Sequence, residues 1–84
     1  MSRARSNQPP VSVECVANGQ PRALRWQGRT WRIEAVLNRW RVETGWWDIP
    51  IQRDYYKVAL DHGGILLLVH DQAADGWFVR RVYA

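Results

Sequence analysis

Cysteine, lysine and histidine are scarce in this chain, and the shortages of cysteine and histidine exclude some chemistry. Cys15 is the only cysteine among 84 residues, so the chain cannot form an internal disulfide or offer a pair of thiolates to zinc. His62 and His70 are the only histidines. If the segment between them is an extended strand of a hairpin, they lie roughly 20 Å apart at about 3.3 Å per residue, too far to share a metal ion. We therefore expect no metal site and no cofactor. A lone thiol also suits a protein of the reducing cytoplasm.

Long apolar runs are missing as well. The longest strictly apolar run is residues 65–69, whereas about 20 residues are needed to cross a bilayer. The N-terminus also lacks the apolar core of a secretion signal. We expect no membrane contact and a cytoplasmic location.

No arrangement of residues points to catalysis. The aspartates near turns and strand ends stand where aspartate ordinarily caps the backbone, and the chain has no glycine-rich phosphate loop. The alternation of the first strand places Cys15 inward, as a packed thiol rather than a nucleophile. We expect that the protein is not an enzyme.

Aromatic residues are abundant instead. Six Trp, three Tyr and one Phe stand within a 46% hydrophobic composition, which is typical of a folded chain, and a chain of this length forms one domain. Pro9 and Pro10 cannot donate backbone hydrogen bonds to a sheet. We predict a disordered basic arm at residues 1–10 and a single domain at residues 11–84.

Alternating apolar and polar residues predict a hairpin at the start of this domain. Residues 11–16 lead to Asn18-Gly19, the dipeptide that best fits a two-residue type I′ turn, and residues 20–26 return. This register places Val13 opposite Leu24 and Val11 opposite Trp26.

A second turn at residues 27–29 leads into another strand. Whichever position Gly28 takes in a two-residue loop, one side of the sheet carries Leu24, Trp26, Trp31 and Ile33. Arg25 and Arg32 lie on the other side, where like charges placed together are a candidate anion site. Glu14 and Glu34 share that side, so a self-neutralised surface is the alternative.

Residues 33–44 admit two interpretations. Apolar residues recur at helical spacing from Ile33 to Trp40, but residues 39–42 alternate like a strand and no good capping residue precedes Ile33. A bent strand is favoured over a short helix. Gly45 then allows a sharp turn or bulge, and the next strand is expected to begin at Arg53.

Residues 53–60, 65–70 and 77–83 predict a three-stranded meander whose loops hold two or four residues. One predicted face carries Tyr56, Val58, Leu60, Ile65, Leu67, Val69, Phe78 and Val82. The second carries Tyr55, Lys57, Ala59, Leu66, Leu68, His70, Trp77, Val79, Arg81 and Tyr83. Because both faces are apolar, either the N-terminal hairpin folds over the second face or that face meets a partner. The whole pattern predicts an all-β fold, a small antiparallel SH3-like barrel or roll of five to six strands.

Positive charge is concentrated in the first half of the chain. Residues 1–44 hold eight arginines against three glutamates, a net of +5, whereas residues 45–84 hold four cations against five aspartates, a net of −1. The planar fork of arginine suits contacts with phosphate. The interpretation is a nucleic-acid surface whose phosphate contacts come from Arg22, Arg25, Arg29, Arg32, Arg39 and Arg41.

Aromatic side chains edged by cations are predicted on the second face of the meander. Such a surface lets unpaired bases stack while the phosphates are neutralised, which favours single-stranded DNA as the ligand. The predicted members are Tyr55, Lys57, Trp77, Arg81 and Tyr83, with Trp47 as a further stacking residue.

Three blocks of sequence carry a family resemblance: Gly45-Trp46-Trp47-Asp48, residues 53–58 and residues 76–83. From Trp40 to Ala84 the chain resembles a family of small bacterial domains of unknown function, and it is similar to the C-terminal segment of the ImuB-like proteins related to Y-family polymerases. In the standalone family, residues 24–29 and 36–40 also match. The resemblance implies an accessory or docking module of bacterial translesion DNA synthesis, and it brings no catalytic residue with it.

Two functional hypotheses follow. The favoured one is a non-enzymatic β module that binds nucleic acid in DNA repair. The alternative is a docking or self-associating module whose second face meets a repair or replication protein, or another copy of the chain.

Overall fold

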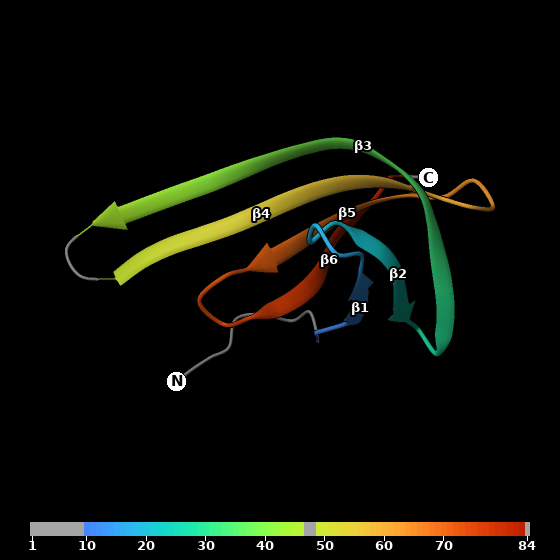
Figure 1. Cartoon of the computed structure of the whole chain (residues 1–84), viewed down its shortest axis with the longest axis horizontal. Helices are drawn as coiled ribbons and strands as arrows, with labels where there is room; N and C mark the ends of the chain where they lie inside the picture. Colours follow the sequence, from blue (N-terminus) through green and yellow to red (C-terminus); the bar gives the residue numbers. More distant parts are fainter. Residues whose placement is uncertain (1–9, 47–48, 84) are drawn as a thin grey trace.

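A single sheet of six antiparallel strands runs through the computed structural model, with the strands in sequence order. The structure describes residues 10–46 and 49–83, and for residues 44–46 and 49–50 it describes the backbone alone. The sheet curls into a half-barrel (Figure 1), which confirms the predicted all-β fold. The strands are β1 (Ser12–Cys15), β2 (Pro21–Trp26), β3 (Arg29–Trp46), β4 (Ile49–Leu60), β5 (Ile65–Asp71) and β6 (Gly76–Val82).

The hairpin of β1 and β2 has the predicted pairing but a different turn. Between β1 and β2, only Gly19 has a positive φ, 90°, and its N–H donates to the carbonyl of Val16 at 2.8 Å. The loop therefore holds three residues, and the predicted type I′ turn is wrong. Val13 still pairs with Leu24 because Arg22 is an extra residue of β2 at a bulge, which offsets the longer loop.

The turn between β2 and β3 is of the two-residue type. Gln27 and Gly28 have φ values of 54° and 76°, as a type I′ turn requires at both central positions. Gly28 is thus the second loop residue. Leu24 lies opposite Trp31 and Arg25 opposite Thr30, so the predicted sides of this part of the sheet are confirmed.

β3 is the predicted bent strand, and it serves two parts of the sheet. Its residues 29–32 pair with β2, and from Ile33 onward it pairs with β4. Register shifts after Ile33 and after Val36 mark bulges, which bend a strand. The bend carries the β1–β2 hairpin over one face of β4–β6 (Figure 1). We call the covered face the inner face and the opposite one the outer face.

Beyond the rest of the sheet, β3 and β4 continue as a two-stranded ribbon, residues 43–46 paired with 49–52 (Figure 1). β5 follows β4 only as far as Arg53. The predicted turn at Gly45 and the predicted strand start at Arg53 are therefore wrong, because pairing continues with Gly45 opposite Pro50. Proline is tolerated at that position because no strand of the sheet flanks β4 there on the side away from β3.

β4 and β5 pair in a register that exchanges the predicted faces of β5. Their loop, residues 61–63, holds three residues, with Gly63 at a φ of 102° and the N–H of Leu60 donating to the carbonyl of Gly64. An odd loop in place of an even one shifts the register by one residue, which reverses the side chains that share a face. Leu66 and Leu68 therefore lie with Val58 and Tyr56 on the inner face.

A bulge in β6 reverses the faces once more. Before it, Trp77 lies opposite His70 and Val79 opposite Leu68, on the inner face. After it, Arg81 lies opposite Leu67 on the outer face. Trp77 is therefore not on the face predicted for it, because the short β4–β5 loop places it on the inner face. Arg81 does lie on its predicted face.

The core lies between the hairpin and the inner face. Its buried members are Leu24, Tyr56, Val58, Leu60, Leu66 and Leu68. The N–H of Val11 donates to the carbonyl of Trp77 at 2.8 Å, in place of the predicted pairing with Trp26. Neither predicted alternative holds as stated, because the predicted second face does not exist: the hairpin covers Leu66 and Leu68 of that face together with Tyr56 and Val58 of the other. Cys15, predicted to be packed, is exposed, because it comes last in β1, where the pairing with β2 shifts at the Arg22 bulge.

Candidate nucleic-acid interface

The outer face of β3–β6 brings aromatic and cationic side chains together in rows. The pairing places Trp40, Tyr55, Val69 and Phe78 in one row, and Lys57, Leu67 and Arg81 in the next. Tyr83 follows beyond them, with its N–H donating to the carbonyl of Ile65 at 2.8 Å. We call this set the Tyr83 face: Trp40, Tyr55, Lys57, Leu67, Val69, Phe78, Arg81 and Tyr83.

The first row is built on a stacked aromatic pair. The rings of Trp40 and Tyr55 lie parallel, 5.3 Å apart between centroids with an interplanar angle of 3°. Trp40 is 39% exposed although it is stacked. Part of the Trp40 side chain is therefore accessible to a further planar group, such as a base.

Two cations flank the ring of Tyr83. The Nζ of Lys57 lies 4.8 Å from the ring centroid and the guanidinium carbon of Arg81 lies 5.9 Å from it. Within residues 10–46 and 49–83, no carboxylate oxygen lies within 4 Å of either cation. Tyr83 is 44% exposed, so positive charge is held beside an accessible ring.

The floor of the Tyr83 face is apolar. Leu67 and Val69 are only 8% and 5% exposed, although they point away from the main core. Their neighbours across the strands, the side chains of the two rows, cover them. The surrounding rings and cations therefore lie over a packed apolar layer.

Arg41, a predicted phosphate contact, is instead engaged in an ion pair. Its Nε donates to Asp54 at 2.7 Å and one terminal nitrogen donates to the other carboxylate oxygen at 3.4 Å. Gln72 donates to Asp54 at 2.6 Å. The hydrogen bond from Arg41 lowers the pKa of Asp54, and the same bond raises the pKa of Arg41.

The other predicted arginines lie on several surfaces. Arg39 shares the inner side with Arg41, with its guanidinium 5.7 Å from the ring of Tyr56. Arg29 lies 5.1 Å from the ring of Trp31. Arg22, at the β2 bulge, is 4.0 Å from Glu14, and both side chains are exposed.

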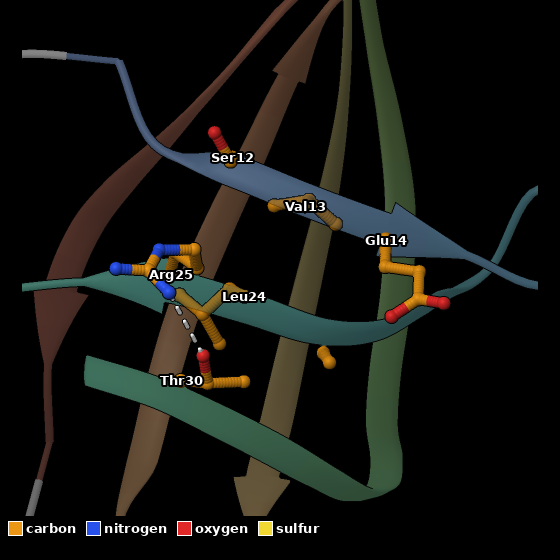
Figure 2. Close-up of a pocket in the computed structure, with 7 residues that line it drawn as sticks. Ser12, Val13, Glu14, Leu24, Arg25 and Thr30 are labelled. Atoms are coloured by element: carbon orange, nitrogen blue, oxygen red, sulfur yellow. Dashed lines mark hydrogen bonds between the residues drawn. The ribbon is translucent and has the colours of Figure 1, made fainter.

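Arg25 borders a shallow hollow on the hairpin (Figure 2). The hollow has a volume of about 290 Å³ and is lined by Ser12, Val13, Glu14, Ala23, Leu24, Arg25 and Thr30. Figure 2 shows Arg25 and Glu14 at its two ends, and Arg25 donates to Thr30 at 3.5 Å. Arg32 lies on the same side of the sheet as Arg25. Because β2 and β4 lie across the core from each other, this side points away from the Tyr83 face.

The structure thus brings together only part of the predicted site. Tyr55, Lys57, Arg81 and Tyr83 share one face, and the six arginines of the first half do not form one surface with them. Trp77 stacks on His70 on the inner side, with 4.5 Å between ring centroids. Trp47 lies outside the described residues.

Trp40 is the residue that the sequence analysis missed. It lies directly opposite Tyr55, which would have followed from unbroken pairing of the two strands out to Trp46 and Ile49. Gly45 and Pro50 instead suggested that the pairing ended earlier. The alternation of residues 39–42 was the available signal.

Among residues 10–46 and 49–83, no group of three or more His, Cys, Asp or Glu side chains is close enough to hold a metal ion. The same residues form no helix that is long and apolar enough to cross a membrane.

The fold and this face together define a small antiparallel half-barrel with an aromatic and cationic outer surface. The chain belongs to the family described as a domain of unknown function, DUF6504, whose model matches residues 3–84. No curated protein matches the chain, and no solved structure does.

Proposed function

We propose that the protein is a non-enzymatic module that binds single-stranded nucleic acid on the Tyr83 face. Bases stack on the Trp40–Tyr55 pair and on Tyr83, while Lys57 and Arg81 neutralise the phosphates between them. Proteins that bind single strands without sequence preference combine these same two elements.

The observation that carries the proposal is the pair of cations beside Tyr83. Lys57 and Arg81 come from β4 and β6, and both lie within 6 Å of one exposed ring. These two cations have no carboxylate oxygen within 4 Å among the described side chains, so they are available to an anionic ligand.

The proposed context is bacterial DNA repair. The blocks at residues 45–48, 53–58 and 76–83 resemble the C-terminal segment of ImuB-like proteins, which implies an accessory role in translesion synthesis. Tyr55, Lys57, Arg81 and Tyr83 belong to those blocks. The proposed location is the cytoplasm, where bacterial DNA repair takes place.

Quenching of tryptophan fluorescence by a short single-stranded DNA tests the proposal. With two phosphate contacts we expect the logarithm of the affinity to fall with the logarithm of salt at a slope of about −1.4, from about −0.7 per contact on single strands. Six contacts from the arginines of the first half would instead give a slope of about −4. Unchanged fluorescence at low salt and micromolar protein would refute the proposal.

A matched pair of double variants locates the site. Lys57→Gln with Arg81→Gln is expected to weaken binding and to flatten the salt dependence. Arg25→Gln with Arg32→Gln removes the same charge from the opposite side and is expected to leave the slope unchanged. The reverse result would assign binding to the hairpin.

Tyr83, one of the proposed stacking residues, can be tested separately. Tyr83→Ala should weaken binding roughly 5- to 150-fold, since base–aromatic stacking contributes about 1–3 kcal/mol per base. Val82→Ala, next in sequence and 53% exposed but on the inner side, is the control. Equal affinities of these two variants would remove Tyr83 from the site.

Docking of a repair or replication protein on the same face is the second candidate. Ile51 of the ribbon lies on the same side of the sheet as Trp40 of the Tyr83 face, and these apolar residues are 40% and 39% exposed. An apolar interface of this kind would resist salt. A partner captured at high salt, lost on Trp40→Ala and not displaced by DNA, would favour this candidate.

A further inference from the structure

The second half of β3 has a long edge without a neighbouring strand. From Asn38 to Trp46, β3 pairs residue by residue with β4 on one side, and no other strand in the described part of the chain pairs with it there. Both bulges of β3 lie earlier, between Ile33 and Asn38. This nine-residue edge contains no proline, but it carries Arg39, Arg41 and Glu43. Charged side chains discourage pairing at an open edge, so a strand that pairs here has to match these charges.

The β3–β4 ribbon at the end of this edge gains little stability from its own two strands. Residues 43–46 and 49–52 form two strands without a third, and a two-stranded hairpin is marginally stable by itself in water. Pro50 weakens the β4 edge as a pairing surface. The β3 edge is therefore the one suited to accept a further strand.

We propose that a second copy of this chain occupies the edge. The two β3 strands run antiparallel about a two-fold axis at Val42, so that residues 38–46 of one copy face residues 46–38 of the other. The nine-residue edge is centred on Val42, so this axis uses all of it. A two-fold contact needs only one self-complementary surface, and the joined sheet has twelve strands.

Charge complementarity selects this axis. With Val42 opposite itself, Arg41 faces Glu43 of the second copy, and the same pair recurs across the axis. Within one copy, Arg41 already contacts Asp54 at 2.7 Å and Glu43 at 3.5 Å. Because Arg41 is 47% and Glu43 55% exposed, the contact across the axis would join these pairs into one network of alternating charges. Cross-strand pairs of opposite charge stabilise a sheet.

Neighbouring axes are less favourable. An axis at Arg41 places two arginines opposite each other, and an axis at Glu43 does the same with two glutamates. An axis at Trp40 sets Arg39 against Arg41. Like charges directly opposite each other destabilise a pair of strands. The Arg41 axis would also bring Arg39 opposite Glu43, but of these four registers only the Val42 axis places no like charges opposite each other.

A cysteine at the axis tests the register directly. In a Cys15→Ser background, Val42→Cys should form a covalent dimer on mild oxidation, because directly opposed residues have Cα atoms about 4.5–5.5 Å apart, within the range of a disulfide. Asn38→Cys is the control. Its own counterpart would lie more than about 20 Å away at 3.3 Å per residue, so it should not cross-link.

Folded Val42→Cys protein that stays monomeric on oxidation, or equal cross-linking of the two variants, would overturn the proposal. A second pair of variants keeps the test open if the cysteine perturbs the fold. Glu43→Lys places like charges across the axis and should raise the dimer dissociation constant at least tenfold in sedimentation equilibrium.

Glu34→Lys is the matched control, since Glu34 is also exposed on β3 but lies at a bulge before the proposed contact. Equal effects of the two charge reversals would contradict the proposed dimer. A wild-type chain that is monomeric at the highest soluble concentration would contradict it as well. The association needs no nucleic acid, so it stands or falls separately from the proposed function.

Discussion

Asp54 is the one buried charged side chain among the described residues, at 3% exposure. Burial of a carboxylate is costly unless it is paired and hydrogen-bonded. Arg41 and Gln72 supply the hydrogen bonds, the first from β3 and the second from the β5–β6 loop. This carboxylate therefore ties the base of the ribbon to the rest of the sheet, which explains why Arg41 is not free for phosphate.

Asp54→Asn is expected to lower the free energy of unfolding by about 1.5–3 kcal/mol at pH 7, since hydrogen bonds to charged groups contribute that much. The folded state holds the pKa of Asp54 below its ordinary value of 3.8. The ionised pair thus stabilises the fold above that value, and this contribution is lost as the pH falls through the lower, folded-state pKa.

Urea denaturation at pH 7 and at two values below 3.8 measures this effect. The difference between wild type and Asp54→Asn should shrink on acidification. Glu43→Gln removes an exposed partner of Arg41 at 3.5 Å and should change stability by less than about 1 kcal/mol. A difference that is constant with pH would show that the charge of Asp54 does not stabilise the fold.

At the scale of the strands, the sequence predicted which segments form strands better than it predicted the register in which the strands pair. Alternation at Val11–Val13 and Thr30–Ile33 identified the first three strands and their sides, because each such strand has one wet and one buried side. β4 and β5 are apolar on both sides around Ala59 and Leu67, so periodicity could not decide which face was inner. Register then depended on the loop of residues 61–63, and a single residue of loop length reversed the result.

The candidate site was predicted in part for the same reason. Tyr55, Lys57 and Arg81 came together as expected, although Arg81 did so because the β6 bulge cancelled the loop error. Trp77 precedes that bulge, so the face predicted for it is wrong. A bulge leaves no reliable mark in a single sequence, since the extra residues at these two bulges, Arg22 in β2 and Arg80 in β6, are ordinary strand residues.

The loop that sets this register makes its own prediction. Gly63 has a φ of 102°, a conformation that side chains with a Cβ rarely adopt. Gly63→Ala should cost about 1–3 kcal/mol of stability. The control is Gly76→Ala, where the φ is not left-handed and an added Cβ would meet only Phe78 at an ordinary 3.5 Å. Equal midpoints in thermal unfolding would contradict the assigned turn.

At the scale of the whole molecule, the hairpin of β1 and β2 closes the core. Leu24 is 1% exposed and packs with residues of β4 and β5, so it joins the two parts of the sheet. Leu24→Ala should cost about 2–5 kcal/mol, as large-to-small changes in a core do. Leu37→Ala, at a site that is 50% exposed, should change stability by less than about 1 kcal/mol. Similar losses in urea denaturation would refute the packing.

The same closure separates two cationic surfaces. Arg25 and Arg32 lie on the outside of the hairpin, and Lys57 and Arg81 lie across the core from them on the Tyr83 face. A ligand cannot contact both at once unless it wraps around the molecule. Binding must therefore choose one side, which makes the location of the ligand the decisive question.

Mapping amide chemical shifts during titration with a short single-stranded DNA answers that question most directly. We expect the largest changes at Lys57, Leu67, Arg81 and Tyr83, with small changes around Arg25 and Arg32. Absence of changes at low salt, or changes concentrated at the hairpin hollow, would contradict nucleic-acid binding on the Tyr83 face.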